Sequence, residues 1–386
     1  MTPWLAAFIS LHFCPPLVSS YQLTHLLACC ACLLLVAPKW RHSWTLPSAY
    51  FAAWLAFAVI GGCFQPGWYW HIYGDYLRYE GAATWVLLTV MAALYWQLKR
   101  NTAWLELACV MVLLLQTAAI LYRWDGADFI MGETKIAVAA FACVAGALLY
   151  AAHPAMLLFA AVPLAWGCNR GALAAVCVGI VVYHAFTANT RLEWRKIACI
   201  AAILTALSIP LTQKLLSTSV TGYGPRSQWM LQASAIASGC PVAGFGFDTQ
   251  IDYLNNPVGP ASEAKAHPGS TYKSDRCHNI AFDTILQTGW VGYTLLLLSL
   301  GAAIGTVILH KTGKNCALLA AVAAFVTFSL FNPAGTPSLG LAICCLFGIR
   351  KDQTLPAAPV PLHQRLCPLE TLSPLALRRD APHQRI

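Results

Sequence analysis

The sequence predicts an all-α polytopic membrane protein with about twelve transmembrane helices and one large polar loop. Of its 386 residues, 58% are apolar and 10% are charged, whereas soluble globular chains have roughly 25% charged residues. Apolar runs recur along almost the whole chain, and a transmembrane helix needs roughly 20 such residues. These runs do not alternate with a period of two, so helices rather than a β-barrel are expected to satisfy the backbone in the bilayer.

The net charge of +9 indicates membrane orientation rather than nucleic-acid binding. The Lys and Arg residues lie in short clusters between the apolar runs, as the orientation of membrane helices requires. Most of the 16 cysteines lie inside apolar runs, where cysteine packs as a small hydrophobe. The one CxxC pair, Cys29 and Cys32, lies within an apolar run and has no second pair at zinc spacing, so we expect no metal site and no cofactor.

Residues 1–212 are expected to form an N-terminal transmembrane bundle. The N-terminal segment lacks the basic region and cleavage site of a signal peptide, so we expect it to be part of the mature protein. An aromatic loop from Gln65 to Glu80 is typical of the membrane interface, with glycan stacking or a lid as the alternative. The predicted spans are residues 3–18, 19–37, 46–63, 81–98, 103–122, 136–151, 154–167, 171–188 and 197–212.

The C-terminal part begins with residues 213–282, which we expect to be a polar loop with short amphipathic helices. Residues 283–349 are then expected to be transmembrane helices, and residues 350–386 a Pro-rich, basic and disordered tail. The predicted C-terminal spans are residues 283–309, 316–331 and 337–349.

The basic clusters orient the predicted spans. Alternating the spans across the bilayer places most of the clusters on one side, which the positive-inside rule makes cytoplasmic. Both termini are then cytoplasmic and the large polar loop is external. The clusters are Lys39/Arg41, Lys99/Arg100, Arg191/Arg195/Lys196, Lys311/Lys314 and Arg350/Lys351.

Arg226 in the polar loop is a candidate for binding an anion. It follows Pro225, and Pro at the first position of a helix favours helix entry. Residues 227–237 are good helix formers, with Trp229, Ala233 and Ile236 on one stripe. The helix N-terminus and the guanidinium fork together suit a phosphate. The alternative is an ordinary solvated loop arginine.

Arg170 and His278 are the other two candidates. Arg170 opens a span, where charge is costly, so it either snorkels to lipid headgroups or faces a polar cavity. His278 precedes a span and is able to accept a proton from a sugar hydroxyl near neutral pH. A polar surface histidine is the alternative, and His267 and Asp275 are nearby rivals for the base.

Smaller patterns predict local packing. The glycines of Gly244-Phe245-Gly246-Phe247 are expected to let the backbone turn and approach a neighbour closely. Gly301 and Gly305 form a small-xxx-small pattern that favours helix packing. A disulfide between Cys240 and Cys277 is an open alternative to two free thiols.

The candidate residues also occur in an order that resembles a known family. An Asn-Arg-Gly triplet opens a span, the external loop follows, and a His-Asn pair precedes a glycine-containing helix. The combination resembles the O-antigen ligase / O-antigen polymerase superfamily. The matching residues are Asn169-Arg170-Gly171, Arg226-x-x-Trp229, Pro241-x-x-Gly244-x-Gly246, His278-Asn279 and Leu286-Gln287-x-Gly289-x-x-Gly292.

The resemblance implies a metal-independent, inverting glycosyltransferase of the bacterial cell inner membrane. Such enzymes take a glycan from an undecaprenyl diphosphate carrier on the periplasmic face, and they need no cofactor. Ligases attach it to the lipid A–core acceptor, whereas polymerases attach it to another carrier-linked repeat. We expect a ligase, with a polymerase as the alternative. By position, Arg170 and Arg226 would bind the diphosphate, and His278 would activate the acceptor hydroxyl.

Two departures from the family pattern leave the acceptor open. Asn169 stands where relatives usually have Ser, and residues 131–135 lack the asparagines of a stretch that many relatives carry. Two other classes of protein are alternative interpretations: a transporter or flippase, and a non-catalytic scaffold or sensor. The spans are nearly free of charge and show no internal repeat, which disfavours a transporter.

Overall fold

The structure is a computed structural model. It describes residues 44–64, 71–72, 81–98, 101–122, 129–130, 133–167, 169–187, 233–247, 277, 279–332 and 335–351. The chain divides into two compact units, Met1–Arg350 and Lys351–Ile386, and all described residues except Lys351 belong to the first. The predicted spans 3–18, 19–37 and 197–212 lie outside the described residues.

The described part of the chain is mostly helical, and its helices follow the predicted spans closely. Five of them are long and apolar enough to cross a membrane, which fits a membrane-embedded protein. These five are α3 (Leu46–Cys63), α6 (Ala103–Tyr122), α7 (Lys135–Ala152), α9 (Arg170–Thr187) and α14 (Ile280–Leu309).

The other apolar helices are shorter. They are α5 (Ala82–Leu98), the 3-10 turn η2 (Pro154–Leu157) with α8 (Leu158–Gly167), α15 (Gly313–Ser329) and α16 (Thr336–Gly348). A two-residue antiparallel pair, β1 (Phe129–Ile130) and β2 (Glu133–Thr134), precedes α7. The sequence pattern did not predict this small ladder.

N-cap side chains set where several helices begin. Thr45 and Ser48 form a capping box at the start of α3, which satisfies two backbone donors that the helix itself leaves unpaired. Thr134, Asn279 and Thr312 cap α7, α14 and α15 with a side-chain oxygen that accepts from backbone N–H groups of the first turn. Each such cap contributes about 0.5–2 kcal/mol relative to alanine.

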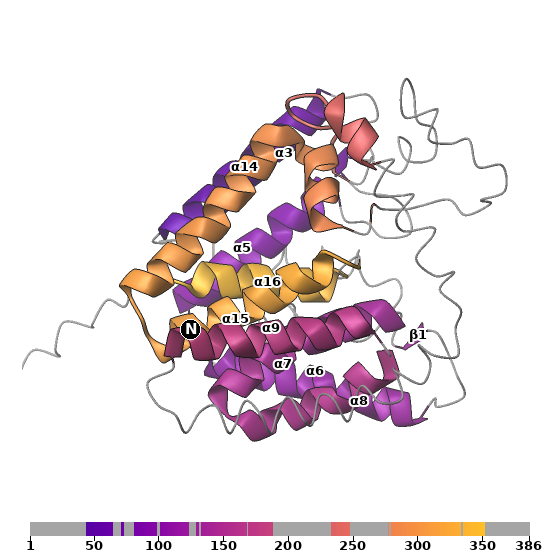
Figure 1. Cartoon of the computed structure of the whole chain (residues 1–386), viewed down its shortest axis with the longest axis vertical. Coiled ribbons are helices and arrows are strands. Elements are labelled where there is room, and N and C mark those ends of the chain that lie inside the picture. Colours follow the sequence, from indigo (N-terminus) through magenta and orange to yellow (C-terminus); the bar gives the residue numbers. More distant parts are fainter. Residues whose placement is uncertain are drawn as a thin grey trace, which may run out of the picture. The chain divides into compact units, whose positions relative to one another are not determined.

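The helices pack through a core of small and aromatic side chains. Helix α15 lies against both α9 and α7, and α16 lies against α5 and α15. Figure 1 shows α14 and α3 side by side, and these two helices share one of the most extensive contacts in the fold. Helix α7 is buried along almost its whole length, so it forms the centre of the described bundle.

Helix α14 contains a sharp break at Gly289, whose backbone has φ 69° and ψ 178°. This conformation is essentially restricted to glycine. Helix α14 begins at Ile280 rather than at the predicted residue 283. It has a short first segment, and the helix axis changes direction at the break. The segment after the break matches the roughly 20 residues that a spanning helix needs.

The loop at residues 241–247 fits into this break, as its glycines predict. Gly244 and Gly246 have φ of 74° and 102°. The N–H groups of Phe245 and Gly246 donate to the carbonyl oxygens of Leu286 and Gln287 at 2.7 and 3.0 Å. The loop thus supplies hydrogen bonds to carbonyls beside the break, and the expected close approach of backbones is confirmed.

In the described part of the chain, Gly301 and Gly305 have no packing partner. A Cβ atom built on either glycine meets no atom of the described residues within 4 Å. Three predicted spans lie outside those residues, so the packing role of the two glycines stays a prediction.

Candidate functional site

Arg170 lies at the first position of α9 and its side chain is exposed. The residue before it, Asn169, accepts a hydrogen bond from the N–H of Ala172 at 3.2 Å through its side-chain oxygen. This is the contact of an N-cap residue. Arg170 therefore projects from a fixed helix start, where the positive end of the helix dipole adds to its own charge.

A reciprocal pair of side-chain amides attaches this helix start to the turn after α15. Asn169 Nδ2 donates to Asn332 Oδ1 at 3.1 Å, and Asn332 Nδ2 lies 3.4 Å from Asn169 Oδ1. A Cβ at Gly171 would overlap the Asn332 amide, so the glycine of the Asn-Arg-Gly triplet leaves room for the pair. Asn332 is buried, which protects both hydrogen bonds from water.

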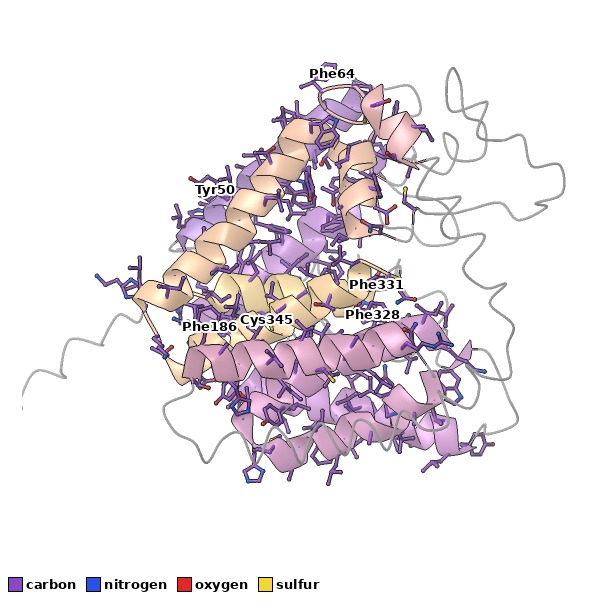
Figure 2. All side chains as sticks on the ribbon, viewed as in Figure 1. Tyr50, Phe64, Phe186, Phe328, Phe331 and Cys345 are labelled. Carbon is purple, nitrogen blue, oxygen red and sulfur yellow. The ribbon has the colours of Figure 1, made fainter. Side chains whose placement is uncertain are left out.

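The start of α14 is attached to the same turn. Asn279 caps α14 through its side-chain oxygen, which accepts from the N–H groups of Ala281 and Phe282 at 2.9 and 3.4 Å. Its side-chain nitrogen donates to the carbonyl oxygen of Leu330 at 3.1 Å. Phe328 and Phe331, labelled in Figure 2, mark the end of α15 where this turn begins. The turn Leu330–Asn332 thus holds two helix starts at once.

His278 and Arg226 both lie outside the described residues. The two neighbours of His278 are described. Cys277 is buried and its N–H donates to the Asp283 carboxylate at 3.0 Å, while Asn279 caps the helix. Asp283 lies in the first turn of α14, where a carboxylate interacts favourably with the helix dipole by about 0.3–1 kcal/mol.

A cavity of about 90 Å³ opens beside the turn Leu330–Asn332, between α3, α5, α14, α15 and α16. Its walls are mainly apolar, with Phe51, Trp54 and Trp85 on one side. The polar side chains gather around the turn and the start of α14. They are Asp283, Thr284, Gln287, Ser329 and Asn332.

Ser329 adds an unmet hydrogen-bonding capacity to this cavity. Its buried hydroxyl oxygen has no partner among the described residues. A buried hydroxyl without a partner costs about 1–3 kcal/mol. The cavity therefore combines a hydrocarbon-like interior with polar groups that suit an amphiphilic molecule.

The loop at residues 241–247 closes the fold near the Gly289 break. Phe247 is fully buried and stacks on His71, with ring centroids 5.6 Å apart and planes 8° apart. Its ring also packs against Trp54 and Trp85, which line the cavity. Complete burial of such a side chain contributes roughly 1.5–3 kcal/mol, so the loop is firmly attached to the cavity wall.

His71 is the polar centre of this attachment. Its Nδ1 accepts a hydrogen bond from the N–H of Phe247 at 2.8 Å, and its Nε2 lies 3.1 Å from the carbonyl oxygen of Val59. This pattern requires a neutral ring with the proton on Nε2. Burial lowers the pKa of His71, and the hydrogen bond to Val59 opposes that shift.

The two loop cysteines are free thiols in the structure. Cys240 donates to the carbonyl oxygen of Ile285 at 3.3 Å, and burial raises its pKa to about 12. Cys277 belongs to the same small apolar cluster, which also contains Ala233 and Ile236. Residues 233–238 are helical, so this much of the predicted amphipathic helix, with its buried Ala233 and Ile236, is confirmed.

Sequence reasoning placed Arg170 at a helix start, as the structure has it, but it singled out neither Asn332 nor His71. Asn332 stood in a short Asn-Pro-Ala-Gly connection that is typical of an ordinary turn. His71 stood in the aromatic loop, for which the predictions were a membrane interface or, as the alternative, glycan stacking or a lid. Neither has a local signal, because their partners lie 163 and 176 positions away in the chain.

No group of three His, Cys, Asp or Glu side chains in the described part of the chain has the geometry of a metal site. No protein-family model matches this chain, and a comparison with curated proteins finds no match.

Proposed function

We propose that this protein is a lipid-linked glycan transferase of the O-antigen ligase type, embedded in the bacterial inner membrane. About twelve spans and a periplasmic loop at residues 213–282 complete the proposed architecture. The donor is a glycan on undecaprenyl diphosphate, and the acceptor is the lipid A–core. The family resemblance of the sequence supplies these substrates.

The meeting of two helix starts at one turn carries the proposal. Arg170 follows Asn169, which binds Asn332, and His278 precedes Asn279, which binds Leu330. The two candidate residues are therefore direct sequence neighbours of two side chains that are attached to the same three-residue turn. A scaffold protein has no need for this convergence.

The cavity supports the same function. The N-cap of α14 is followed by Ile280, which lines the cavity together with Asn332. The start of α14, and the Asn332 side chain to which the start of α9 is bonded, thus border a largely apolar cavity. A lipid diphosphate has this combination of hydrocarbon and concentrated negative charge, and arginine is suited to the diphosphate because its fork binds two oxygens at once.

The distribution of charge in the bundle supports the proposed orientation. Lys314 and Arg350 both lie over the Trp96 ring, at 4.8 and 5.5 Å from its centroid. Lys314 is in the first turn of α15, whereas Asn332 follows the last turn of the same helix. The basic end and the candidate site are thus at opposite ends of α15, which fits a cytoplasmic basic end and an external site.

The proposed reaction follows from these groups. The oxygen of an acceptor hydroxyl forms the new bond to the anomeric carbon, and its proton passes to His278. The bond from that carbon to the diphosphate oxygen breaks, and undecaprenyl diphosphate leaves with the bonding electrons. Arg170 and Arg226 stabilise the negative charge that grows on the leaving group. A general base contributes typically 10²–10⁴-fold in rate.

Complementation tests the function. Expression in a bacterial strain without O-antigen ligase should restore the lipopolysaccharide ladder on a gel. The His278→Ala variant should reach the membrane in equal amount and restore nothing. Absence of a ladder with the correctly inserted wild-type protein would contradict the ligase function.

A second host distinguishes the polymerase alternative. A polymerase-deficient strain makes core with a single repeat, and its conversion to a ladder would assign polymerase activity in place of ligase activity. Reporter fusions within residues 213–282 provide an independent check. A cytosolic location of that segment would exclude both functions, since the exported donor would not reach it.

A further inference from the structure

We infer that Asn332 is a positioning residue that fixes the Arg170 end of α9 relative to the start of α14. The inference rests on the proposed function for its catalytic meaning, but the contact itself is independent of that function. The side-chain amide of Asn332 is engaged by Asn169 rather than by substrate in this scheme. It acts through Asn169, which it binds by two amide hydrogen bonds.

The first argument is that Asn332 is held rigidly. Its N–H donates to the carbonyl oxygen of Phe328 at 3.0 Å, which continues the last turn of α15. Asn332 is 3% exposed, so its half of the amide pair is shielded from water. Two side-chain amides that are joined by two hydrogen bonds adopt one relative orientation, because both donors and both acceptors must be aligned.

The second argument is that the connected elements are distant in the chain. Asn169 and Asn332 are 163 positions apart, and Asn279 and Leu330 are 51 positions apart. No local rule of helix capping relates the start of α9 to the start of α14. The turn Leu330–Asn332 is the shared support, since one of its residues binds each helix start.

The third argument concerns the catalytic geometry. An arginine that stabilises a leaving group and a base that activates a hydroxyl must be aligned in the same transition state. A misplacement of about 1 Å is enough to reduce the rate by about 10²-fold. Loosening the amide pair would change the alignment and not the groups that bind the substrate, so kcat should fall while KM is nearly unchanged.

Asn315 offers a matched control at the other end of α15. It is also buried, and its side-chain nitrogen donates to the carbonyl oxygens of His310 and Arg350 at 3.0 and 2.9 Å. It thus connects the end of α14 with the end of α16, as Asn332 connects two helix starts. Removing the Asn332 amide removes two side-chain hydrogen bonds and removing the Asn315 amide removes three, and only Asn332 borders the candidate site.

The test compares Asn332→Ala, Asn315→Ala and Asn169→Ser in purified protein with a lipid-linked donor. Serine retains a helix-capping side chain but cannot form the amide pair. We expect Asn332→Ala and Asn169→Ser to lower kcat roughly 10- to 100-fold with KM within about twofold, and the double variant to be no slower than Asn332→Ala. Asn315→Ala should lower the thermal midpoint by a comparable amount and retain kcat within about twofold.

Hydrogen exchange separates a failure of this inference from a failure of the proposed function. Asn332→Ala should speed amide exchange in a peptide that covers residues 166–175, and Asn315→Ala should do so only around residues 310–316. Unchanged exchange at the start of α9, or an equal loss of kcat in Asn315→Ala, would overturn the positioning role. Faster exchange with no glycan transfer by wild-type protein would support the attachment and reject the transferase function.

Discussion

The N–H of Phe247 donates a hydrogen bond to Nδ1 of His71 at 2.8 Å. The two rings are stacked, and neither residue is exposed to solvent. Through this bond the loop that fits into the α14 break is attached to the end of α3, because His71 also contacts the carbonyl oxygen of Val59. One neutral imidazole therefore connects three segments beside the cavity.

The first prediction is that acid weakens the fold through His71. Its pKa is lowered in the folded protein, so the unfolded chain binds a proton first as the pH falls. Stability is fully present above about pH 6.5, the ordinary pKa of histidine. It is lost progressively below that value until the lowered folded pKa is reached. Thermal unfolding in detergent between pH 8 and pH 5 measures this loss.

The His71→Gln variant is the control for the acid effect. Glutamine retains a donor and an acceptor but does not titrate. Its thermal midpoint should be lower than that of wild type at pH 8 and should change less between pH 8 and pH 5. Equal pH dependence in both proteins would show that other groups cause the acid effect.

The second prediction concerns the break in α14. Gly289→Ala combines backbone strain with an overlap between the new Cβ and the carbonyl oxygen of Val242. Strain and overlap together should cost about 2–6 kcal/mol. Gly301→Ala adds a methyl group where no described residue lies within 4 Å, and it should stabilise the helix by about 0.5–1 kcal/mol. Thermal unfolding of the two variants should therefore shift in opposite directions.

The third prediction tests the role of Arg170. Arg170→Lys retains the charge but replaces the planar fork by a point charge. The loss of one hydrogen bond to a charged group, about 1.5–3 kcal/mol, should lower kcat/KM for glycan transfer roughly 10- to 150-fold. Because the side chain is exposed, the thermal midpoint should not move. A variant with wild-type transfer rates would show that Arg170 is only an interfacial charge.

The fourth prediction concerns the loop cysteines. Since the pKa of Cys240 is raised to about 12, little thiolate is present at neutral pH and a maleimide should react with it slowly. Cys63 is exposed and should be labelled before Cys240, as mass spectrometry of peptides can show. Recovery of a Cys240–Cys277 linked peptide before reduction would contradict the free thiols.

Whether a structural feature was predictable from the sequence depends on how far apart in the chain the interacting residues lie. Helix α6 covers the predicted 103–122, and α3 covers the predicted 46–63, because length and hydropathy decide where such helices lie. The turn at Gly244 and Gly246 was also predictable, since only glycine adopts those backbone angles without strain. The break at Gly289 was not, although the glycine itself belonged to the quoted motif.

The amino-acid sequence alone thus determined the class of the protein, the positions of its apolar helices and the candidate residues at their starts. Only the tertiary structure decided that Asn169 meets Asn332, that His71 supports Phe247, and that α14 breaks at Gly289. The physical reason is that helix formation depends on neighbouring residues, whereas these contacts join side chains far apart in the chain. Their alignment depends on the packing of several helices together.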